Sequence, residues 1–345
     1  MTFFDKARPG HIHVQNAQQL TSSRVGRRTV VFGGMALAAM HFPVHAARTW
    51  PEKPVRLIVP FTPGGSSDVA ARTISVALQE AIRQPVLVEY KPGANGNLGA
   101  DYVAKSGADG HTLLVTDVIG LAISPAVYSN MGFDPVKDLR GVSLLTRAPH
   151  VLVVTPSLGL NTLGELVALS KRSNLNCATS ALGSPPHLAC VQIALATGAK
   201  WEYVPYKGGS QAMTDTISGH TQLLMNSLAS TLPYIQSGRL KALAISSPQR
   251  SPLVPEFATI SESGLPGFES GSWQGVMASN AVPAELLAQI NAAVIGVARS
   301  AEVRARVTAQ GAQVVTGTPK EMDAFFITEM KRWGDLARRQ NIRAD

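Results

Sequence analysis

The chain has 345 residues, of which 45% are hydrophobic and 16% are charged, with 30 Gly and 22 Pro. This composition excludes a disordered or fibrous protein, and the length is sufficient for two domains. The formal net charge is +8, and residues 1–47 carry about half of it. A mild positive excess suits an anionic small molecule and is too dispersed for a nucleic-acid binder. Two cysteines without a C-x-x-C motif exclude a zinc ribbon and a disulfide-rich scaffold.

The first 47 residues have the pattern of an export signal. Arg27-Arg28 precede the apolar run Val30–Met40, which is too short to span a bilayer. Small residues at Val44 and Ala46 occupy the positions that a signal peptidase reads. We therefore expect a twin-arginine-like signal peptide over 1–47, cleaved near Ala46-Ala47, and a soluble periplasmic protein. The general secretion route remains an alternative.

The mature chain alternates between predicted strands and helices. We expect strands over five short apolar runs: Val55–Phe61, Val86–Tyr90, Thr112–Thr116, Val151–Val154 and Leu243–Ser246. We expect helices where apolar residues recur at helical spacing: Val69–Ile82, Leu163–Lys171, Leu188–Thr197, Gln211–Ser218, Ala284–Arg299 and Glu321–Arg338. Such alternation predicts an α/β fold with mostly parallel sheets, whose ligands bind where strands lead into helices.

Four predicted strand-to-helix loops are rich in Gly and Ser: Pro63–Asp68, Gly93–Gly99, Ser180–His187 and Tyr206–Ala212. Val59–Ser66 and Val204–Ser210 share the order strand, Pro, aromatic residue and Gly-Gly-Ser, as if they were matching corners of two lobes. Glycines let the backbone approach a ligand closely, and helix N-termini attract anions. The alternative is that these turns only cap helices.

The sequence gives little support for nucleotide binding, metal binding or catalysis. The chain has no G-x-G-x-x-G, Walker A, H-E-x-x-H or G-x-S-x-G motif, and the His residues lack metal-ligand spacing. We therefore predict no cofactor, no metal site and no catalytic residue. Ser184 and His187 could touch, but Pro185-Pro186 between them favours a rigid helix entry. Asp68 is interpreted as a helix cap more readily than as a catalyst.

An ordered set of motifs spans about residues 50–340 and resembles the solute-binding proteins of the tripartite tricarboxylate transporter family, the Bug or TctC-like group. The segments that carry the resemblance are Trp50–Phe61, Pro63–Asp68 with Ala71-Arg72, Lys91–Gly96, Asp109–Leu114, Asp134–Leu139, Gly183–Ala189, Val204–Gly209, Gly264–Phe268 and Ser272-Trp273 with Gly275.

The resemblance implies a two-lobed, Venus-flytrap fold that binds a small carboxylate between its lobes. The first lobe would comprise residues 48–150 plus 271–345, and the second would comprise 151–270. The resemblance implies ligand contacts from the first lobe at Phe61, Gly65, Ser66, Ser67, Asp68, Asn95 and Thr116, and from the second at Ser180, Gly183, Ser184, His187 and Asn226. Asn226 departs from the family, which often has Asp there, and this weakens any preference for a ligand amine.

Cys177 and Cys190 are candidates for a disulfide. They are the only two thiols of a chain expected in an oxidising compartment, and they flank the loop Ser180–His187. A pair of buried free thiols is the alternative.

We expect a monomeric periplasmic solute-binding protein that delivers a di- or tricarboxylate, an amino acid or an aromatic acid to a tripartite tricarboxylate-type permease in the inner membrane. One alternative is a ligand sensor that docks on a signalling partner. Another is an exported serine hydrolase that uses Ser184 or Ser66. We expect the carboxylates to bridge Ser66-Ser67 on one lobe and Ser184 with His187 on the other.

Overall fold

The computed structural model describes residues 50–344, which belong to one compact unit that spans residues 48–345. The predicted signal peptide and its cleavage site lie outside the described residues.

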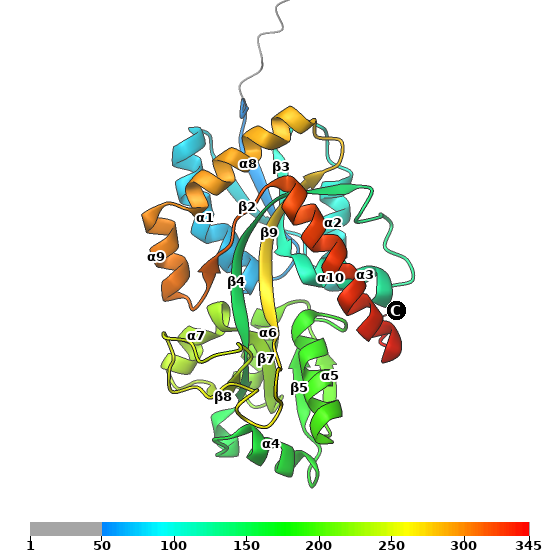
Figure 1. The fold of residues 1–345 in the computed structure, drawn as a ribbon, viewed down its shortest axis with the longest axis vertical. Helices are drawn as coiled ribbons and strands as arrows, with labels where there is room; N and C mark the ends of the chain where they lie inside the picture. Colours follow the sequence, from blue (N-terminus) through cyan, green and yellow to red (C-terminus); the bar gives the residue numbers. More distant parts are fainter. Residues whose placement is uncertain (1–49, 345) are drawn as a thin grey trace, which may run out of the picture. The chain divides into compact units, whose positions relative to one another are not determined.

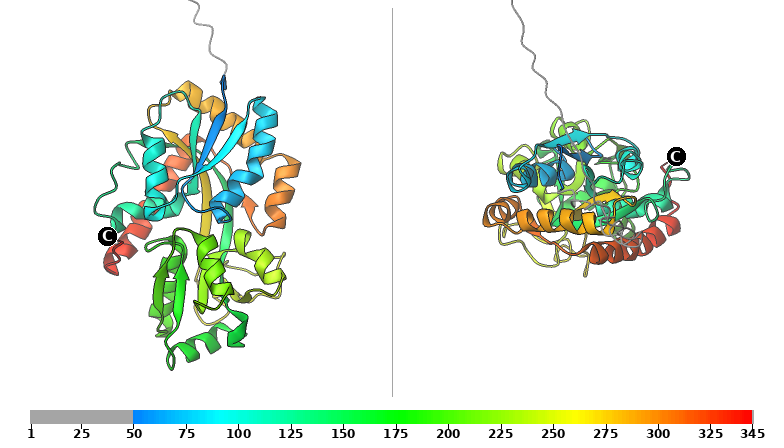
Figure 2. Two further views of the ribbon diagram at one scale, coloured as in Figure 1. Left: turned by 180° about the vertical axis from the view of Figure 1, so that it is seen from behind. Right: turned by 90° about the horizontal axis from the view of Figure 1, so that it is seen from above.

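The first lobe is built on a mixed sheet. Strand β1 (Val55–Val59) lies between β2 (Val86–Tyr90) and β3 (Thr112–Asp117), and all three are parallel. Strand β9 (Gly271–Ser279) pairs antiparallel with β3 and with β4 (Leu139–Val154). Helices flank this sheet (Figures 1 and 2), so its central strands are apolar over most of their length.

Helices cover both faces of this sheet. Because neighbouring residues of a strand point to opposite faces, each strand packs against helices on both sides. Leu57 packs with Ile74 and Ile290 on one face, and Ile58 packs with Leu121 and Phe326 on the other. The remaining elements of this lobe are α1 (Ser66–Ile82), η1 (Ala94–Gly96), α2 (Asn97–Ala104), α3 (Val118–Val127), α8 (Ala284–Ala298), α9 (Ala301–Ala309), β10 (Gln313–Val314) and α10 (Pro319–Arg339).

The second lobe repeats the plan on a smaller scale. Strand β5 (Asn176–Thr179) lies between β6 (Glu202–Pro205) and β7 (Leu223–Ser227), and the three are parallel. The last residues of β4 pair antiparallel with β7 and with β8 (Lys241–Ile245). The other elements are η2 (Pro156–Leu158), α4 (Leu163–Ser170), α5 (Pro185–Thr197), α6 (Gly209–Ile217) and α7 (Leu228–Gln236).

Two long antiparallel strands, β4 and β9, connect the lobes through the middle of the molecule (Figure 1). Strand β4 pairs with β9 from Leu139 to Pro149 and with β7 from His150 onward. His150 therefore marks the point where β4 leaves one sheet and enters the other.

Most predicted elements are confirmed, with boundaries that differ by a few residues. Strand β2 has the predicted bounds, and α8 ends one residue before the predicted Arg299. The prediction of a strand at Val151–Val154 was too short, because β4 begins at Leu139. Strand β9 was not predicted.

In the described part of the chain, no single helix is both long and apolar enough to cross a membrane. Helices α8 and α9 meet those two criteria only when taken together, as a pair bent by 65°.

Candidate functional site

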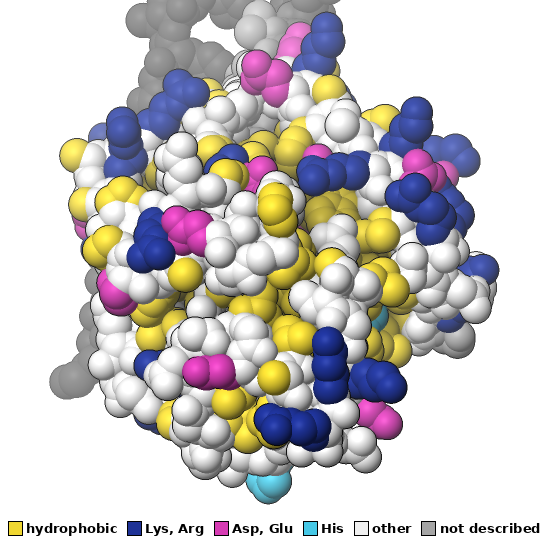
Figure 3. All heavy atoms as spheres, turned by 60° about the horizontal axis from the view of Figure 1, so that its bottom comes forward, with side chains coloured by type: hydrophobic (Ala, Val, Ile, Leu, Met, Phe, Trp, Pro, Cys, Tyr) yellow, Lys and Arg dark blue, Asp and Glu magenta, His cyan; other side chains and the backbone are white. Residues whose placement is uncertain are grey.

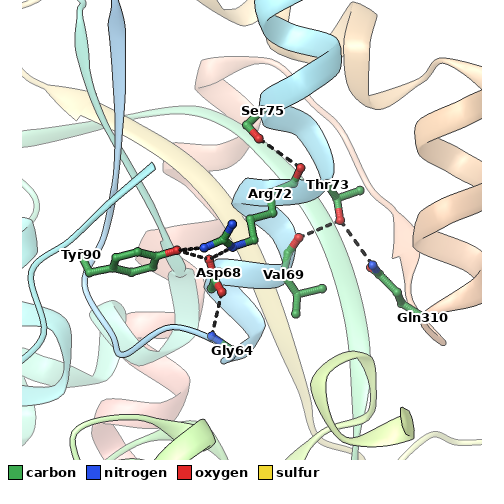
Figure 4. A network of polar contacts seen from close by, with 8 residues as sticks. All are labelled: Gly64, Asp68, Val69, Arg72, Thr73, Ser75, Tyr90 and Gln310. Carbon is green, nitrogen blue, oxygen red and sulfur yellow. Dashed lines mark hydrogen bonds and ion pairs between the residues drawn. The ribbon is translucent and has the colours of Figure 1, made fainter. Parts of the chain in front are cut away.

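The loop between β1 and α1 is held in place by Asp68. Its Oδ2 accepts a hydrogen bond from Gly64 N at 2.7 Å, and its Oδ1 accepts from Tyr90 Oη at 2.7 Å and from Arg72 Nε at 2.8 Å. Figure 4 shows these three donors gathered on the one carboxylate. Because Asp68 is buried and already has three partners, its evident role is to fix the loop.

The first turn of α1 is anchored from β9 by Gln274. Ser67 Oγ donates to Gln274 Oε1 at 2.7 Å, and Gln274 Nε2 donates to Ser66 Oγ at 3.2 Å. Ser67 and Gln274 are both buried. One amide side chain therefore orients both of the serine hydroxyls in this turn that were expected to contact the ligand.

Asp117 caps α3 beside this contact. Its Oδ1 accepts hydrogen bonds from Ile119 N at 3.1 Å and Gly120 N at 3.2 Å, which is the usual role of an N-cap side chain. Gln274 Nε2 lies 3.4 Å from Oδ2. Burial raises the pKa of Asp117 to about 7, although hydrogen bonds from Gly120, Ser272, Ile119 and Trp273 oppose the rise.

The loop of the second lobe is closed on itself by short hydrogen bonds. Ser184 Oγ donates to Ala181 O at 2.7 Å, and Gly183 N donates to His187 Nδ1 at 3.1 Å. The His187 ring also meets the Tyr203 ring edge-on, with centroids 4.5 Å apart. Burial lowers the pKa of His187 to about 4, so the ring is neutral at pH 7. These contacts support the loop, and direct ligand contacts of Ser184 and His187 remain predictions.

The loops of the two lobes touch. Thr62 Oγ1 lies 2.9 Å from Ser210 Oγ, within hydrogen-bonding distance. A Cβ added to Gly208 would lie 2.5 Å from Thr62 Oγ1, and one added to Gly120 would lie 3.5 Å from Pro185. The N-termini of α1 and α6 therefore face each other across the lobes, as do those of α3 and α5.

Four helix N-termini thus meet at this junction, two from each lobe. The first amides of a helix have no carbonyl partner within the helix, and the helix dipole adds positive potential there. No side chain caps these amides in α1 and α6. In α3, Asp117 already accepts from two of them, and α5 begins with Pro185-Pro186, which have no N–H. Such a setting binds an anion without requiring a metal or a charged side chain. Within residues 50–344, no group of three or more His, Cys, Asp or Glu side chains is placed to hold a metal ion.

Two buried asparagines follow β2, Asn95 in η1 and Asn97 at the start of α2. Asn95 and Asn97 are about 6% and 3% exposed, and the amide N and O atoms of both have no hydrogen-bond partner among the described residues. The backbone of Asn95 is left-handed, with φ +52°. A Cβ added to the adjacent Gly96 would lie 3.1 Å from the Phe61 ring, so this loop lies against the first one. Buried amides of this kind need partners, which a ligand or ordered water can supply.

The other predicted residues lie at the same strand ends. Thr116 is buried on β3, directly before Asp117, and Ser180 is half-buried after β5. Asn226 is buried on β7, where its Nδ2 donates to Ser230 Oγ at 3.3 Å. A Cβ added to Gly209 would lie 2.8 Å from Asn226 Oδ1, so Asn226 lies directly beneath the start of α6.

Cys177 and Cys190 are both buried, and both are free thiols in the structure. Their Sγ atoms are 3.5 Å apart, and they lie beneath the loop Ser180–His187. Burial raises the pKa of Cys177.

A separate hollow of about 850 Å³ lies against the other face of β9. Trp273 lies on its wall, with the Arg147 guanidinium 5.3 Å from the centre of an indole ring. Figure 3 shows recessed apolar side chains between Lys and Arg groups on this side of the molecule. None of the predicted ligand residues lines this hollow. Because side chains alternate along a strand, Ser272 and Gln274 face the polar site while Trp273 faces the hollow.

The sequence analysis missed Asp117 and Gln274. Asp117 directly follows a predicted strand, where an acidic residue before an apolar run is an N-cap signal. Gln274 lies inside the last family-like block, between Trp273 and Gly275, but nothing in the local sequence connects it to Ser66.

Comparison with known proteins gives consistent matches over most of the chain. The model of the tripartite tricarboxylate transporter family receptor, TctC, matches residues 70–342. Protein BugT of Bordetella pertussis (strain Tohama I) is 36% identical over 311 residues, which cover 88% of this chain and 94% of BugT.

Two solved structures with bound small acids are also similar. R. palustris Rpa4515 with adipate is 33% identical, with a TM-score of 0.81, and the match covers 85% of this chain and 98% of that one. MatC (Rpa3494) from Rhodopseudomonas palustris with bound malate is 30% identical, with a TM-score of 0.78 and coverages of 83% and 99%.

Proposed function

Because the chain belongs to the tripartite tricarboxylate transporter receptor family, whose members are periplasmic solute-binding receptors, we propose that it captures a small dicarboxylate between its two lobes. The observation that carries the proposal is the meeting of the N-termini of α1 and α6, one from each lobe and neither capped by a side chain, where the Thr62 and Ser210 loops touch. A dianion with a carboxylate at each end can be held by donors from both sides. The ligand then gives the closed arrangement extra contacts, which shifts the lobe equilibrium toward closure.

The proposed lobes are residues 48–150 with 271–345 and residues 151–270. The proposed ligand contacts are those that the sequence indicated, with Asp117 and Gln274 added as residues that orient them. The proposed dicarboxylate class is supported by two similar proteins, whose structures contain adipate and malate.

The same proposal includes export and delivery. The chain would lose its signal peptide near Ala46-Ala47 and pass its ligand to a permease of the tripartite tricarboxylate type. Mass spectrometry of protein from the periplasm tests the first part, because intact residues 1–46 would contradict it.

The contacts of Ser184 do not favour a serine hydrolase. Its hydroxyl donates to Ala181 O and lies 3.3 Å from Thr179 Oγ1, while His187 Nδ1 accepts from Gly183 N. A nucleophile needs its base within hydrogen-bond reach, and this pair makes no such contact in the structure.

The test is a titration of the mature protein with malate and adipate, followed by thermal unfolding. Saturating ligand at about 100 times Kd should add about 2.7 kcal/mol to the unfolding free energy, which corresponds to a rise in Tm of several degrees. The matched control is the diamide of each acid, which has the same shape but no charge and should not bind. Binding of the diamides as tightly as the acids would contradict an anion site. The absence of binding by every di- and tricarboxylate would contradict the ligand class.

A further inference from the structure

A cluster of buried polar side chains lies at the point where β4 changes sheets. His150 Nδ1 is 3.0 Å from Ser270 Oγ, and His150 Nε2 is 3.2 Å from Ser272 Oγ. His150 N donates to Ser246 Oγ at 2.8 Å, and Ser246 Oγ donates to Ser270 O at 2.6 Å. The cluster therefore joins the end of β8 to the two crossing strands.

The cluster extends toward the first turn of α1 through Asp117 and Gln274. Ser272 contacts the Asp117 carboxyl group, Gln274 Nε2 lies 3.4 Å from Asp117 Oδ2, and Gln274 bonds both Ser66 and Ser67. One consistent set of proton positions runs along it. Ser270 donates to His150 Nδ1, His150 Nε2 donates to Ser272, and Ser272 donates to Asp117.

Every link between the crossing point and α1 is shielded from solvent. The buried members are His150, Ser272, Asp117, Gln274 and Ser67, each no more than 7% exposed. A cavity of about 10 Å³, room for about one water molecule, adjoins the chain and is lined by Ser66, Ser272, Gln274 and Ser227. Ser227 lies at the end of β7 in the second lobe, and its Oγ has no hydrogen-bond partner among residues 50–344.

We propose that this buried chain, which runs from His150 through Ser272, Asp117 and Gln274 to Ser66 and Ser67, positions the first turn of α1 relative to the crossing strands. His150, Ser272 and Gln274 are then positioning residues for ligand binding, and none of the three is a proposed ligand contact. Only the effect on ligand binding rests on the proposed function, since the positioning of α1 can be measured without a ligand.

The physical reason is the high penalty for leaving buried polar groups unpaired. Removal of one link leaves a donor or acceptor without a partner in a water-poor interior, so the neighbouring side chains must rearrange. Networks of this kind allow few alternative arrangements. The first turn of α1 has no other side-chain anchor from β9, so it is the segment that should loosen.

The experiment compares two serines on the same strand. Ser272→Ala removes a link of the chain, and Ser279→Ala removes an equally buried hydroxyl that donates to Ala104 O outside it. Gln274→Met serves as the direct disruption next to α1. Amide hydrogen exchange of the segment Thr62–Val69 is measured in the mature protein without ligand, and titrations with malate and adipate follow.

We expect exchange in Thr62–Val69 to be about five- to tenfold faster in Ser272→Ala and in Gln274→Met than in the parent. Ser279→Ala should leave this segment unchanged, even if its global unfolding free energy falls by a similar amount. Equal exchange in Ser272→Ala and Ser279→Ala overturns the proposal. If exchange rises as expected but neither acid binds the parent, the positioning chain stands and the dicarboxylate proposal fails.

Discussion

Asp117 and His150 have pKa shifts in opposite directions within one polar chain. Burial raises the pKa of Asp117 from 3.8 to about 7 and lowers that of His150 from 6.5 to about 3. Between about pH 4 and 6.5, Asp117 is therefore protonated and His150 is neutral in the folded protein, whereas the unfolded chain has the opposite states. The two contributions to the pH dependence of stability have opposite signs in this window and partly cancel.

Asp117→Asn removes the Asp117 contribution to the pH dependence of stability and leaves that of His150. For a carboxyl group whose folded pKa is raised, stability is greatest below the unfolded pKa and is lost as pH rises through the folded pKa. The parent should therefore lose stability relative to Asp117→Asn between about pH 4 and 7, by at most about 1.4 kcal/mol per pH unit. Urea unfolding of both proteins across this range measures the difference.

The control is Asp134→Asn, because Lys137 lowers the pKa of the Asp134 carboxyl group. Its contribution has the opposite sign and is lost as pH falls below about 4. A constant difference between the parent and Asp117→Asn from pH 4 to 7 would show that the folded-state pKa of Asp117 is not raised.

Gly208 is needed where the two loops meet, because a Cβ there would lie 2.5 Å from Thr62 Oγ1 and 3.1 Å from Thr62 N. Gly208→Ala should therefore hold the loops apart and weaken binding of malate or adipate by about tenfold or more, equivalent to about 1.4 kcal/mol. Calorimetric titration measures the effect. Gly107→Ala is the control, since a Cβ at Gly107 meets no atom within 4 Å. Equal affinities of the two variants would contradict the importance of this contact for closure.

At the scale of single elements, β5 and α5 bring Cys177 and Cys190 together under the second-lobe loop. Because both thiols are buried, and burial raises the pKa of Cys177, the native thiols should react with iodoacetamide only after unfolding. A thiol-oxidising agent present while the chain refolds should join them, since the fold places their Sγ atoms 3.5 Å apart. Closure should raise the unfolding free energy by up to about 3 kcal/mol.

Mass spectrometry detects the loss of two hydrogens, and urea unfolding measures the stability. Cys190→Ala is the control that cannot form the bond. Unchanged mass after oxidant treatment of the parent would remove the disulfide from consideration, and the buried free thiols would be the resting state.

These elements could be predicted from sequence where their hydrophobic pattern is regular. The strand Val86–Tyr90 and the helix from Ala284 have strong local periodicity and were predicted closely. Strand β9 was missed because Ser272 and Gln274 are buried polar residues, paired by partners that lie far away in sequence. The apolar part of β9, Val276–Ala278, is only three residues long, and its first half alternates buried polar residues with Trp273, so no local pattern identifies the strand.

The candidate site shows the same limit. The Gly-Ser loops could be predicted because their residues suit turns and helix starts. Asp68 was interpreted as a helix cap, and its carboxylate accepts a hydrogen bond from Gly64 N, just before α1. The link from Ser66 and Ser67 to Gln274 spans more than 200 residues of sequence, so only the folded chain reveals it.

At the scale of the whole molecule, the hydrogen bond between Thr62 and Ser210 joins the two lobes. Thr62→Val keeps the side-chain shape and removes this bond, so it should weaken ligand binding by about two- to tenfold. Stability of the unliganded protein should change little, because the loops do not form the core. Titration with malate and adipate measures affinity, and small-angle X-ray scattering measures closure.

Thr328→Val on α10 removes an exposed hydroxyl that bonds only within its helix, and it should bind like the parent. If Thr62→Val also binds like the parent and closes to the same radius of gyration, the contact is incidental to closure.

The alternation of side-chain direction along β9 also has a consequence for tryptophan fluorescence. Trp273 lies between Ser272 and Gln274, which belong to the polar chain, and the Arg147 guanidinium lies over its indole ring. A shift of β9 during closure would change the distance between that cation and the ring, and with it the tryptophan emission. The chain contains four tryptophans, of which Trp273 is the one on a crossing strand. The protein therefore carries a native fluorophore where its lobes are joined, and no label is needed to follow its motion.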